Sequence, residues 1–393
     1  MINKVSISNF KSIYKQDIEL GRINVFIGEN GCGKSNILEA IAMAAASNSD
    51  ELNTEGLINR GIRVTKPSLT FNSFLGLNNR SEIKIGLYES EVLIESVLKC
   101  DNPDDIYTTW KDEKNHDKTL KQLMREMLEQ APREKNIDHL YEALFTLSQK
   151  KLLTPKWNNR FAMDIKYRNN SQFLIYNINT NALRGVSNDS KKQPLGINGE
   201  GLDILLSTFT EDQLNELKNL NFISWLKDIH VDLGDTLKYK GYKLGRSTSD
   251  LYFTDKYMQR KNNMFAAENA NEGALHVLFY LALLISVRTP SFFAIDNIET
   301  ALNPMLCRQL MTSITELAKK HNKQALITTH NPAVLDGLNL HDPEQHLFVV
   351  KRNDEGHTKV ERIKLKPNVK DESLKLSELW MRGYLGALPS NIF

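Results

Sequence analysis

Apolar and polar residues alternate at the start of the chain in the manner of β-strands. Val5 and Ile7 alternate with polar neighbours, and after a turn the alternation resumes at Ile18 and Leu20, a period of two that indicates half-buried strands. The next apolar run, 25–27, is continuous, which is typical of a strand buried on both faces. Beyond a glycine-rich turn, apolar residues recur at helical spacing at Ile37, Leu38, Ile41, Ala42 and Ala45. The pattern predicts a strand, a glycine-rich loop and a helix in direct succession.

Beyond residue 98 the pattern changes. Two stretches, 120–128 and 137–147, carry apolar residues on one helical face and predict a helical insertion in an otherwise α/β chain. Residues 247–264 are polar with scattered aromatic side chains, and no element is assigned to them. The remaining predicted elements are strands in 83–94, a strand in 161–177, a helix after a capping box of Thr210 and Gln213, a helix at 275–287, a strand at 292–295, a helix at 306–317, a strand at 325–328 and a hairpin that turns at 354–356.

Composition excludes several classes of protein. The chain has 393 residues, 41% hydrophobic and 25% charged, as in ordinary globular proteins, and its length favours two or three structural units. Because 50 Lys and Arg face 48 Asp and Glu, for a net charge of +2, any basic groove for nucleic acid has to be local. Three cysteines without a Cys-x-x-Cys pair argue against a disulfide framework or a cysteine-rich zinc site. With no signal-peptide pattern and no apolar run of roughly 18 residues, we expect a cytoplasmic protein without a membrane partner.

The glycine-rich loop matches a phosphate-binding motif in full. The pattern G-x-x-x-x-G-K-[ST] is filled by Gly28, Glu29, Asn30, Gly31, Cys32, Gly33, Lys34 and Ser35. Glycines let successive backbone N–H groups turn towards phosphate oxygens, the lysine brings a positive charge to the β- and γ-phosphates, and the serine hydroxyl ligates Mg²⁺. We expect the next residue, Asn36, to belong to the same site. The alternative is a chance match in a glycine-rich turn, and the strand before and the helix after the loop argue against it.

Two later strand ends complete the expected site. An apolar strand ends in Asp296, whose carboxylate would hold Mg²⁺ from the far side of the nucleotide, although a helix N-cap alone would explain an aspartate there. A second strand is followed by His330, and Pro332 then restarts a helix. A lone histidine at a strand end is more often structural, but after a phosphate-binding loop it is the expected sensor of the γ-phosphate. The sequence thus predicts ATP and Mg²⁺ as cofactors, with Ser35 and Asp296 as metal ligands.

These motifs resemble the ABC-type ATPases of the SMC/RecF/OLD-like group, often described as AAA-family ATPases. The turn at 9–12 and the strand and loop at 24–31 are similar to the opening of that group. The run 271–274, Asn-Glu-Gly-Ala, resembles the signature motif, which implies that Asn271 and Gly273 read the nucleotide of a partner subunit. The fold implied is α/β: a P-loop ABC-type ATPase head, with a mixed and parallel sheet flanked by helices and a helical insertion.

Within that group, the run 295–304 is most similar to the ATPases of Septu-type and retron-associated defence systems, which are paired with an HNH-type nuclease. OLD-type proteins carry a metal-dependent nuclease domain after the ATPase. Here the carboxylates that follow His330 are scattered, so the resemblance implies that the nuclease is a separate protein.

Two positions depart from the pattern of the group. Asn271 stands where the signature motif usually has serine, and its amide can still donate to a phosphate. Asn297 stands where the group carries the glutamate that activates water, and an amide cannot act as a general base. Glu299 is a candidate to replace that glutamate. The catalytic candidates are therefore Asp296, Asn297, Glu299 and His330. The resemblance implies ATP binding but does not determine the rate of hydrolysis.

The expected organisation has three parts. Residues 1–98 and 160–350 form the ABC-type ATPase head, residues 99–159 a helical insertion, and residues 351–393 a C-terminal hairpin and apolar tail. The tail is dense in apolar and aromatic residues over 376–389. It either docks on the core, as ordered tails do, or supplies anchors for a partner.

Three functions remain in competition. The first is an ATP-gated dimer, or a higher even oligomer, that sandwiches two nucleotides and signals to a separate effector such as an HNH-type nuclease in antiviral defence. The second is a RecF-like DNA-maintenance ATPase that binds DNA, or RNA, directly. The third is a module that holds ATP without turnover.

Overall fold

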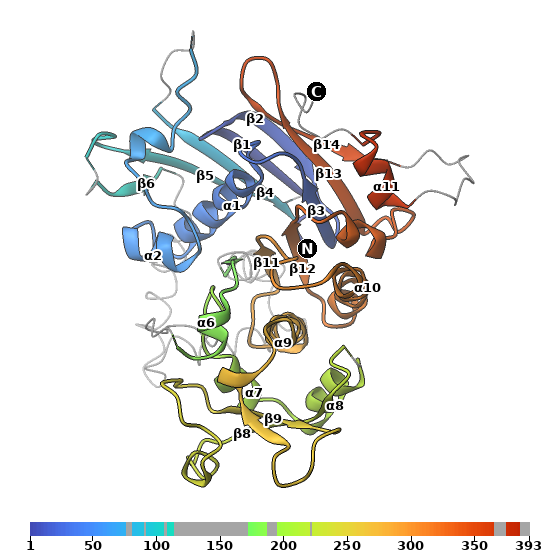
Figure 1. Cartoon of the computed structure of the whole chain (residues 1–393). Helices are drawn as coiled ribbons and strands as arrows, with labels where there is room; N and C mark the ends of the chain where they lie inside the picture. Colours follow the sequence, from blue (N-terminus) through green and yellow to red (C-terminus); the bar gives the residue numbers. More distant parts are fainter. Residues whose placement is uncertain are drawn as a thin grey trace, which may run out of the picture. The chain divides into compact units, whose positions relative to one another are not determined.

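The structure is a computed structural model that describes residues 1–75, 81–89, 92–105, 108–113, 172–186, 195–220, 222–364 and 375–385 (Figure 1). The chain divides into two compact units. The first comprises Met1–Glu19, Glu39–Phe173 and Asp354–His357, and the second comprises Leu20–Leu38, Leu174–Asn353 and Thr358–Phe393. The predicted helices at 120–128 and 137–147 lie outside the described residues.

The first unit is built on a five-stranded antiparallel sheet in the order β2-β1-β4-β5-β6. The side chains of Val5 and Ile7 are buried while Ser6 and Ser8 between them are partly exposed, which confirms the period of two read from the sequence. The elements of this unit are β1 (Lys4–Phe10), β2 (Ile13–Glu19), α2 (Thr54–Asn59), η1 (Pro67–Leu69), β4 (Ile83–Glu89), β5 (Val92–Cys100) and β6 (Trp110–Asp112).

Helix α1 (Lys34–Asn48) begins in the second unit and ends in the first. Within the first unit, Glu39 of this helix is 2% exposed, and its carboxylate accepts hydrogen bonds from Lys11 and Arg63. A buried carboxylate without such partners would destabilise the fold by about 3–5 kcal/mol. The ion pairs therefore fix this part of α1 to the β1–β2 turn, which carries Lys11.

The second unit contains a six-stranded sheet in the order β14-β13-β3-β12-β11-β7. All neighbours are parallel except β13 and β14, which form the predicted antiparallel hairpin. Every residue of β3, β11 and β12 is buried, as expected for parallel strands covered on both faces. The strands are β3 (Ile23–Ile27), β7 (Ile175–Tyr176), β11 (Phe292–Ile295), β12 (Gln324–Thr328), β13 (Gln345–Arg352) and β14 (Thr358–Ile363). The boundary predicted between residues 350 and 351 falls inside β13, so the hairpin is continuous with this sheet.

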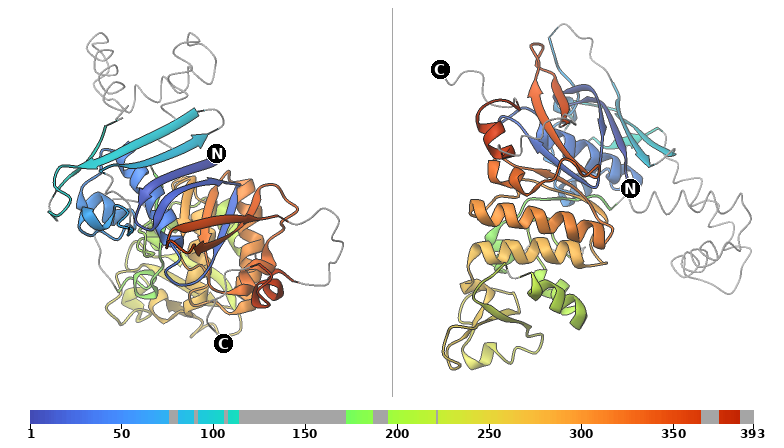
Figure 2. Two further views of the ribbon diagram at one scale, coloured as in Figure 1. Left: turned by 90° about the horizontal axis from the view of Figure 1, so that it is seen from above. Right: turned by 90° about the vertical axis from the view of Figure 1, so that its right-hand side faces the viewer.

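Two long helices of the second unit, α9 (Glu272–Ile285) and α10 (Pro304–Lys320), lie side by side (Figure 2). All residues of α9 after Glu272 are buried, so this helix is apolar all round because it runs through the core. The capping box of Thr210 and Gln213 is confirmed at the start of α8 (Glu211–Asn219). The other helices are α6 (Thr180–Leu183), α7 (Leu202–Ser207), η4 (Pro332–Gly337) and α11 (Leu376–Met381). No described helix combines the length and the apolar character that a membrane crossing requires.

A three-stranded antiparallel sheet in the order β10-β9-β8 was not foreseen from the sequence. Its middle strand lies in the stretch 247–264, to which no element was assigned. The elements here are β8 (Leu226–Val231), η2 (Lys238–Lys240), β9 (Leu251–Asp255), β10 (Met264–Ala266) and η3 (Ala267–Asn269). All five residues of β9 are buried, including Thr254 and Asp255. Because the strand is short and ends in polar residues, the pattern of apolar positions does not predict it.

Candidate nucleotide-binding site

The glycine-rich loop joins the end of β3 to the start of α1, as the sequence predicted. Gly31 and Gly33 have φ angles of 78° and 112°, backbone conformations that side chains rarely adopt. A Cβ atom on Gly28 would lie 2.2 Å from the carbonyl oxygen of Val350 in β13. These positions therefore require glycine, and the loop can curl its N–H groups towards one point.

Strands β13 and β14 support this loop from its outer side. Arg352 donates a hydrogen bond from Nε to the carbonyl oxygen of Gly31 at 3.0 Å, and Thr358 donates from Oγ1 to that of Cys32 at 2.8 Å. These contacts engage carbonyl oxygens and leave the N–H groups of the loop to face a ligand. No sequence pattern indicates this support, since both residues lie more than 300 positions beyond the loop.

Lys34 is a buried cation. Its ammonium group donates to the carbonyl oxygens of Gly28 at 2.8 Å and Glu29 at 3.0 Å, and in the described residues it has no ion pair. Burial lowers the pKa of Lys34, and the nearby Cys32 and Asp296 oppose this shift. A buried ammonium group that is held by two carbonyl oxygens and by Sγ of Cys32, at 3.9 Å, has no carboxylate in contact with it, so the site is suited to an anion.

The second polar group of the site joins Ser35 to two strand ends. The Ser35 hydroxyl donates to Oδ2 of Asp296 at 3.3 Å, and Oδ1 of Asp296 accepts a hydrogen bond from Oγ1 of Thr328. A hydroxyl and a carboxylate are hard oxygen ligands of the kind that Mg²⁺ prefers. Among the described residues no three His, Cys, Asp or Glu side chains form a metal site, so a Mg²⁺ ion here would take further ligands from phosphate and water. The residues present fit ATP with Mg²⁺.

Glu299 accepts two hydrogen bonds from the segment that follows β12. Its Oε2 accepts a hydrogen bond from Oγ1 of Thr329 and its Oε1 accepts one from the backbone N–H of His330, both at 2.8 Å. The sequence had indicated Glu299 as a possible replacement for the missing base. In the structure both carboxylate oxygens are engaged, so Glu299 links the turn after β11 to the loop that carries His330. Thr328 and Thr329 were missed by sequence reasoning, although they stand directly before His330.

Asn297 occupies a left-handed turn, with a φ angle of 57°. Its N–H donates to Oγ1 of Thr328 at 2.9 Å, the hydroxyl that also binds Asp296. Asparagine is one of the few residues that adopt this conformation readily. The backbone of Asn297 therefore belongs to the same hydrogen-bond network as Asp296.

His330 is exposed at the edge of the site. Partial burial of its ring and the positive charge of Lys34 lower its pKa, while Glu299 and Asp296 oppose that shift. Such an imidazole is neutral near pH 7 and can donate one hydrogen bond to a phosphate oxygen. The helix expected from Pro332 is the 3-10 helix η4, with Asn331 as its N-cap at 3.0 Å from the N–H of Ala333.

The signature-like run lies at the start of α9. Asn271 is its N-cap, and its Oδ1 accepts a hydrogen bond from the N–H of Ala274 at 3.2 Å. A Cβ atom on Gly273 would lie 3.1 Å from the carbonyl oxygen of Ala301, in the turn between β11 and α10. In the described residues neither Asn271 nor Gly273 forms a hydrogen bond with the P-loop of its own chain. Their expected role on a partner's nucleotide stays a prediction.

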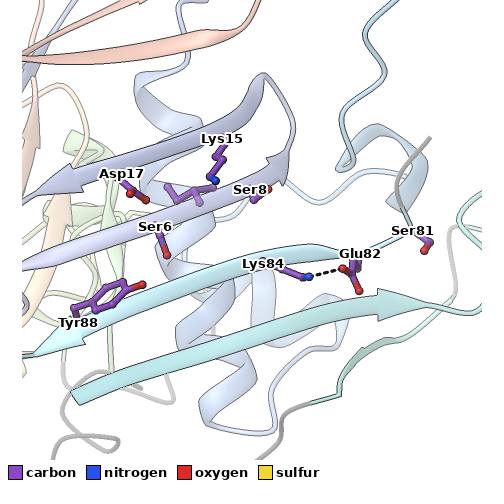
Figure 3. A pocket seen from close by; sticks show the side chains of 9 residues that line it. Ser6, Ser8, Lys15, Asp17, Ser81, Glu82, Lys84 and Tyr88 are labelled. Atoms are coloured by element: carbon purple, nitrogen blue, oxygen red, sulfur yellow. Dashed lines mark ion pairs between the residues drawn. The ribbon is translucent and has the colours of Figure 1, made fainter. Parts of the chain in front are cut away.

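A hollow of about 770 Å³ lies over the sheet of the first unit (Figure 3). Lys84 pairs with Glu82 at 2.6 Å and Asp17 pairs with Lys4 at 3.0 Å, and Lys15, which has no ion pair among the described residues, is exposed. The hollow lacks the buried cation that distinguishes the P-loop, and we place the candidate site at the P-loop. The lining residues are Ser6, Ile7, Ser8, Lys15, Asp17, Ser81, Glu82, Lys84 and Tyr88.

Comparisons with known proteins identify the family of the chain. Residues 1–335 match the family model described as AAA ATPase domain. A stretch of 103 residues, 26% of this chain, is 31% identical to 9% of Structural maintenance of chromosomes protein 6 from Saccharomyces cerevisiae. A stretch of 74 residues, 19% of this chain, is 38% identical to 8% of the DNA double-strand break repair Rad50 ATPase from Thermoplasma volcanium. The chain thus matches less than a tenth of the length of these curated relatives.

The fold is also found among solved structures. An SMC head crystallised with the C-winged helix domain of ScpA is similar with a TM-score of 0.53 at 14% identity, over 94% of this chain and 99% of that one. This likeness confirms the predicted fold class, a P-loop ATPase head with mixed and parallel sheets flanked by helices. Because the family model matches most of its length, the chain belongs to the AAA ATPase domain family.

Proposed function

We propose that the chain binds ATP with Mg²⁺ and acts as a slowly hydrolysing, nucleotide-gated switch for a separate effector protein. The observation that carries this proposal is the buried ammonium group of Lys34, which has carbonyl oxygens and a thiol but no carboxylate in contact and lies near Ser35 and Asp296. Phosphate would supply the missing negative charge, and the N–H groups of the loop together with the start of α1 favour the same anion.

The residues of the site divide the work between binding and positioning. Lys34 would face the β- and γ-phosphates, and Ser35 with Asp296 would hold Mg²⁺, which when bound neutralises charge on the phosphates. His330 would donate a hydrogen bond to the γ-phosphate, and Glu299 keeps its backbone in place. Since Asn297 cannot accept a proton as a glutamate does, slow turnover is the expected result.

The position of α9 supports a proposed dimer. The N-terminal end of α9 is exposed to solvent at Asn271, its N-cap, and at Glu272. Helix N-termini carry a partial positive charge and bind anions. We infer that this end meets the nucleotide of a second copy, giving a dimer or a higher even oligomer that closes around ATP. The resemblance to defence ATPases makes an HNH-type nuclease the effector we propose, in an antiviral role in the cytoplasm.

A second candidate function has support from the matched relatives. The Rad50 match is named a DNA double-strand break repair ATPase, so direct DNA binding by a RecF-like maintenance ATPase is the alternative. A DNA affinity that falls steeply with salt, measured without any partner protein, would favour it, because phosphate contacts release counterions. A wild type without such affinity would favour the effector switch.

The test of the proposed function is nucleotide binding by the Lys34→Ala variant. Isothermal titration with ATP and Mg²⁺ should show binding by the wild type and none by Lys34→Ala, with circular dichroism confirming that both are folded. Lys319→Ala, which removes an exposed lysine of α10, is the matched control and should bind ATP as the wild type does. An unchanged affinity in folded Lys34→Ala protein would contradict the proposal.

A further inference from the structure

A hollow of about 420 Å³ in the second unit lies apart from the residues of the nucleotide site. It is formed by the end of α8, the turn before β8, the loop after β9 and one side of α9. Its apolar lining comprises the partly exposed side chains of Phe222, Ile223 and Leu226 together with the buried Leu217, Leu278 and Leu281. Pockets of about 300–1,000 Å³ with apolar walls are typical binding sites, and nothing in the proposed ATPase cycle uses this one.

The rim of the hollow is cationic. Lys218, Lys227 and Lys256 line it, and Lys218 is neutralised by Asp228 at 2.5 Å. In the described residues Lys227 and Lys256 have no carboxylate partner, and the Lys256 ammonium lies only over the Tyr257 ring, 5.1 Å from its centroid. Two positive charges therefore lie beside the apolar lining of the hollow without a carboxylate partner.

The loop between β9 and β10 extends this surface. Residues 256–263 include three cations and no acidic residue, and Arg260 and Lys261 have no ion pair among the described residues. Tyr257 and Met258 are 75% and 51% exposed. Tyrosine, methionine and arginine are enriched in protein–protein interfaces, so this loop has the composition of a contact surface.

We propose that the hollow and this loop, together the α8–α9 docking surface, bind an acidic segment of a partner protein. An apolar side chain of that segment enters the hollow, and its carboxylates pair with Lys227 and Lys256. Nucleic acid fits this surface less well, because its phosphates would pair with the lysines but would leave the apolar lining of the hollow without an apolar partner. The proposal rests on the proposed function in one respect, namely that a separate effector protein exists.

The position of the surface links the partner to the nucleotide. Leu278 lies on the same rigid helix as Asn271, about 10 Å further along at a rise of about 1.5 Å per residue. A segment seated in the hollow, which Leu278 lines, thus lies beside the helix whose N-terminal end is proposed to meet the partner subunit's ATP. Effector docking and ATP-dependent closure would act on one element.

The test uses the full chain without nucleotide and a fluorescent synthetic helical peptide, read by anisotropy. The probe peptide carries leucines four residues apart, flanked by glutamates. One control peptide has lysines in place of the glutamates, and the other has alanines in place of the leucines. Only the probe should bind, and salt should weaken its binding, because both the apolar anchor and the negative charge are needed.

Variants of the chain locate the binding. The double change Lys227→Glu and Lys256→Glu should weaken the probe at least tenfold, which corresponds to about 1.4 kcal/mol. Ser224→Trp, at an exposed residue lining the hollow, should block it by filling the space without changing charge. The matched control, Lys240→Glu with Lys319→Glu, reverses two exposed lysines elsewhere and should bind the probe within twofold of the wild type.

Three results would overturn the proposal. They are equal binding of all three peptides, probe binding that withstands both surface variants, and tighter binding of a single-stranded oligonucleotide that the same variants abolish. The last result would assign the surface to nucleic acid. Since the assay contains no ATP, Lys34→Ala protein should bind the probe like the wild type, and failure of docking is distinguishable from failure of nucleotide binding.

Discussion

Replacing Glu299 by glutamine and by alanine separates two accounts of ATP turnover. Its two carboxylate oxygens accept hydrogen bonds from Oγ1 of Thr329 and the N–H of His330, both at 2.8 Å. A carboxylate that accepts these two hydrogen bonds holds the segment after β12 in place, although each oxygen keeps a second lone pair. We therefore expect Glu299 to position His330, and not to serve as the general base.

The magnitudes follow from these two contacts. A hydrogen bond to a charged group contributes about 1.5–3 kcal/mol. Because His330 is exposed, we take the lower value for each of the two bonds, so Glu299→Ala should destabilise the fold by about 3 kcal/mol. Glutamine keeps one acceptor for the N–H of His330. Its amide can donate to Oγ1 of Thr329, whose proton then turns to the carbonyl oxygen of Asn331, 3.5 Å away. Glu299→Gln should cost about 1 kcal/mol.

Phosphate release at saturating ATP and Mg²⁺ is the assay. A displacement of His330 by about 1 Å costs about 10²-fold in rate, so Glu299→Ala should be about 10²-fold slower than wild type, and Glu299→Gln less than tenfold slower. If Glu299 acts through His330, the double variant Glu299→Ala, His330→Ala should be no slower than His330→Ala alone. A general base would give the opposite: equal losses of about 10²–10⁴-fold for both single variants and a further loss in the double variant. That outcome would refute the positioning role.

Three further predictions concern turnover, assembly and stability. If Asn297 occupies the position of the missing base, Asn297→Glu should raise the rate of phosphate release and shorten the lifetime of the closed, ATP-bound state. An unchanged rate in folded protein would mean that Asn297 serves only the conformation of the turn. Asn271→Asp keeps the oxygen that caps α9 but adds a negative charge that repels phosphate, so light scattering with a non-hydrolysable ATP analogue should show no dimer. Asn271→Ser, which also caps the helix, should still dimerise. Identical masses of the two variants with the analogue would count against the ATP-sandwich dimer. Burial lowers the pKa of Lys323 to about 8 from 10.5, so between these pH values the unfolded chain binds more protons, and the stability of wild type relative to Lys323→Met should rise by up to about 3 kcal/mol. Chemical denaturation at pH 7.5 and 10 checks this, and a difference that does not change with pH would be inconsistent with it.

The P-loop and its flanking elements were predictable because their signals are local. The run 25–27, the motif that follows and the helical spacing after it are continuous in sequence, and the structure has β3, the loop and α1 in that order. Asp296 was predictable in the same way, as the residue after a short apolar strand. In each case one stretch of the chain carries both the element and its chemistry.

The contacts between strand ends were not predictable, because they depend on which strands are neighbours. Glu299 and Thr329 lie 30 residues apart, and only the parallel pairing of β11 with β12 brings them together. The same holds for Arg352, which supports Gly31 from a strand near the other end of the sequence. The sheet formed by β8, β9 and β10 was missed for a different reason, since β9 is short and ends in buried polar residues.

The turn after β11 shows how backbone and chemistry constrain the same residue. Asn297 has a φ angle of 57°, a conformation that costs most residues about 1–2 kcal/mol and that asparagine tolerates. Glutamate at this position would bear that cost, unless the turn relaxed and released the hydrogen bond from its N–H to Thr328. Because Thr328 also binds Asp296, such relaxation would disturb the proposed metal ligand. The asparagine therefore suits a turn that holds Asp296 firmly, and the same choice removes a carboxylate from the place where the resemblance expects one. A rigid turn at the proposed metal ligand, together with the slow hydrolysis that we propose, is the combination that a switch requires, since the ATP-bound state would then persist long enough to be recognised by another protein.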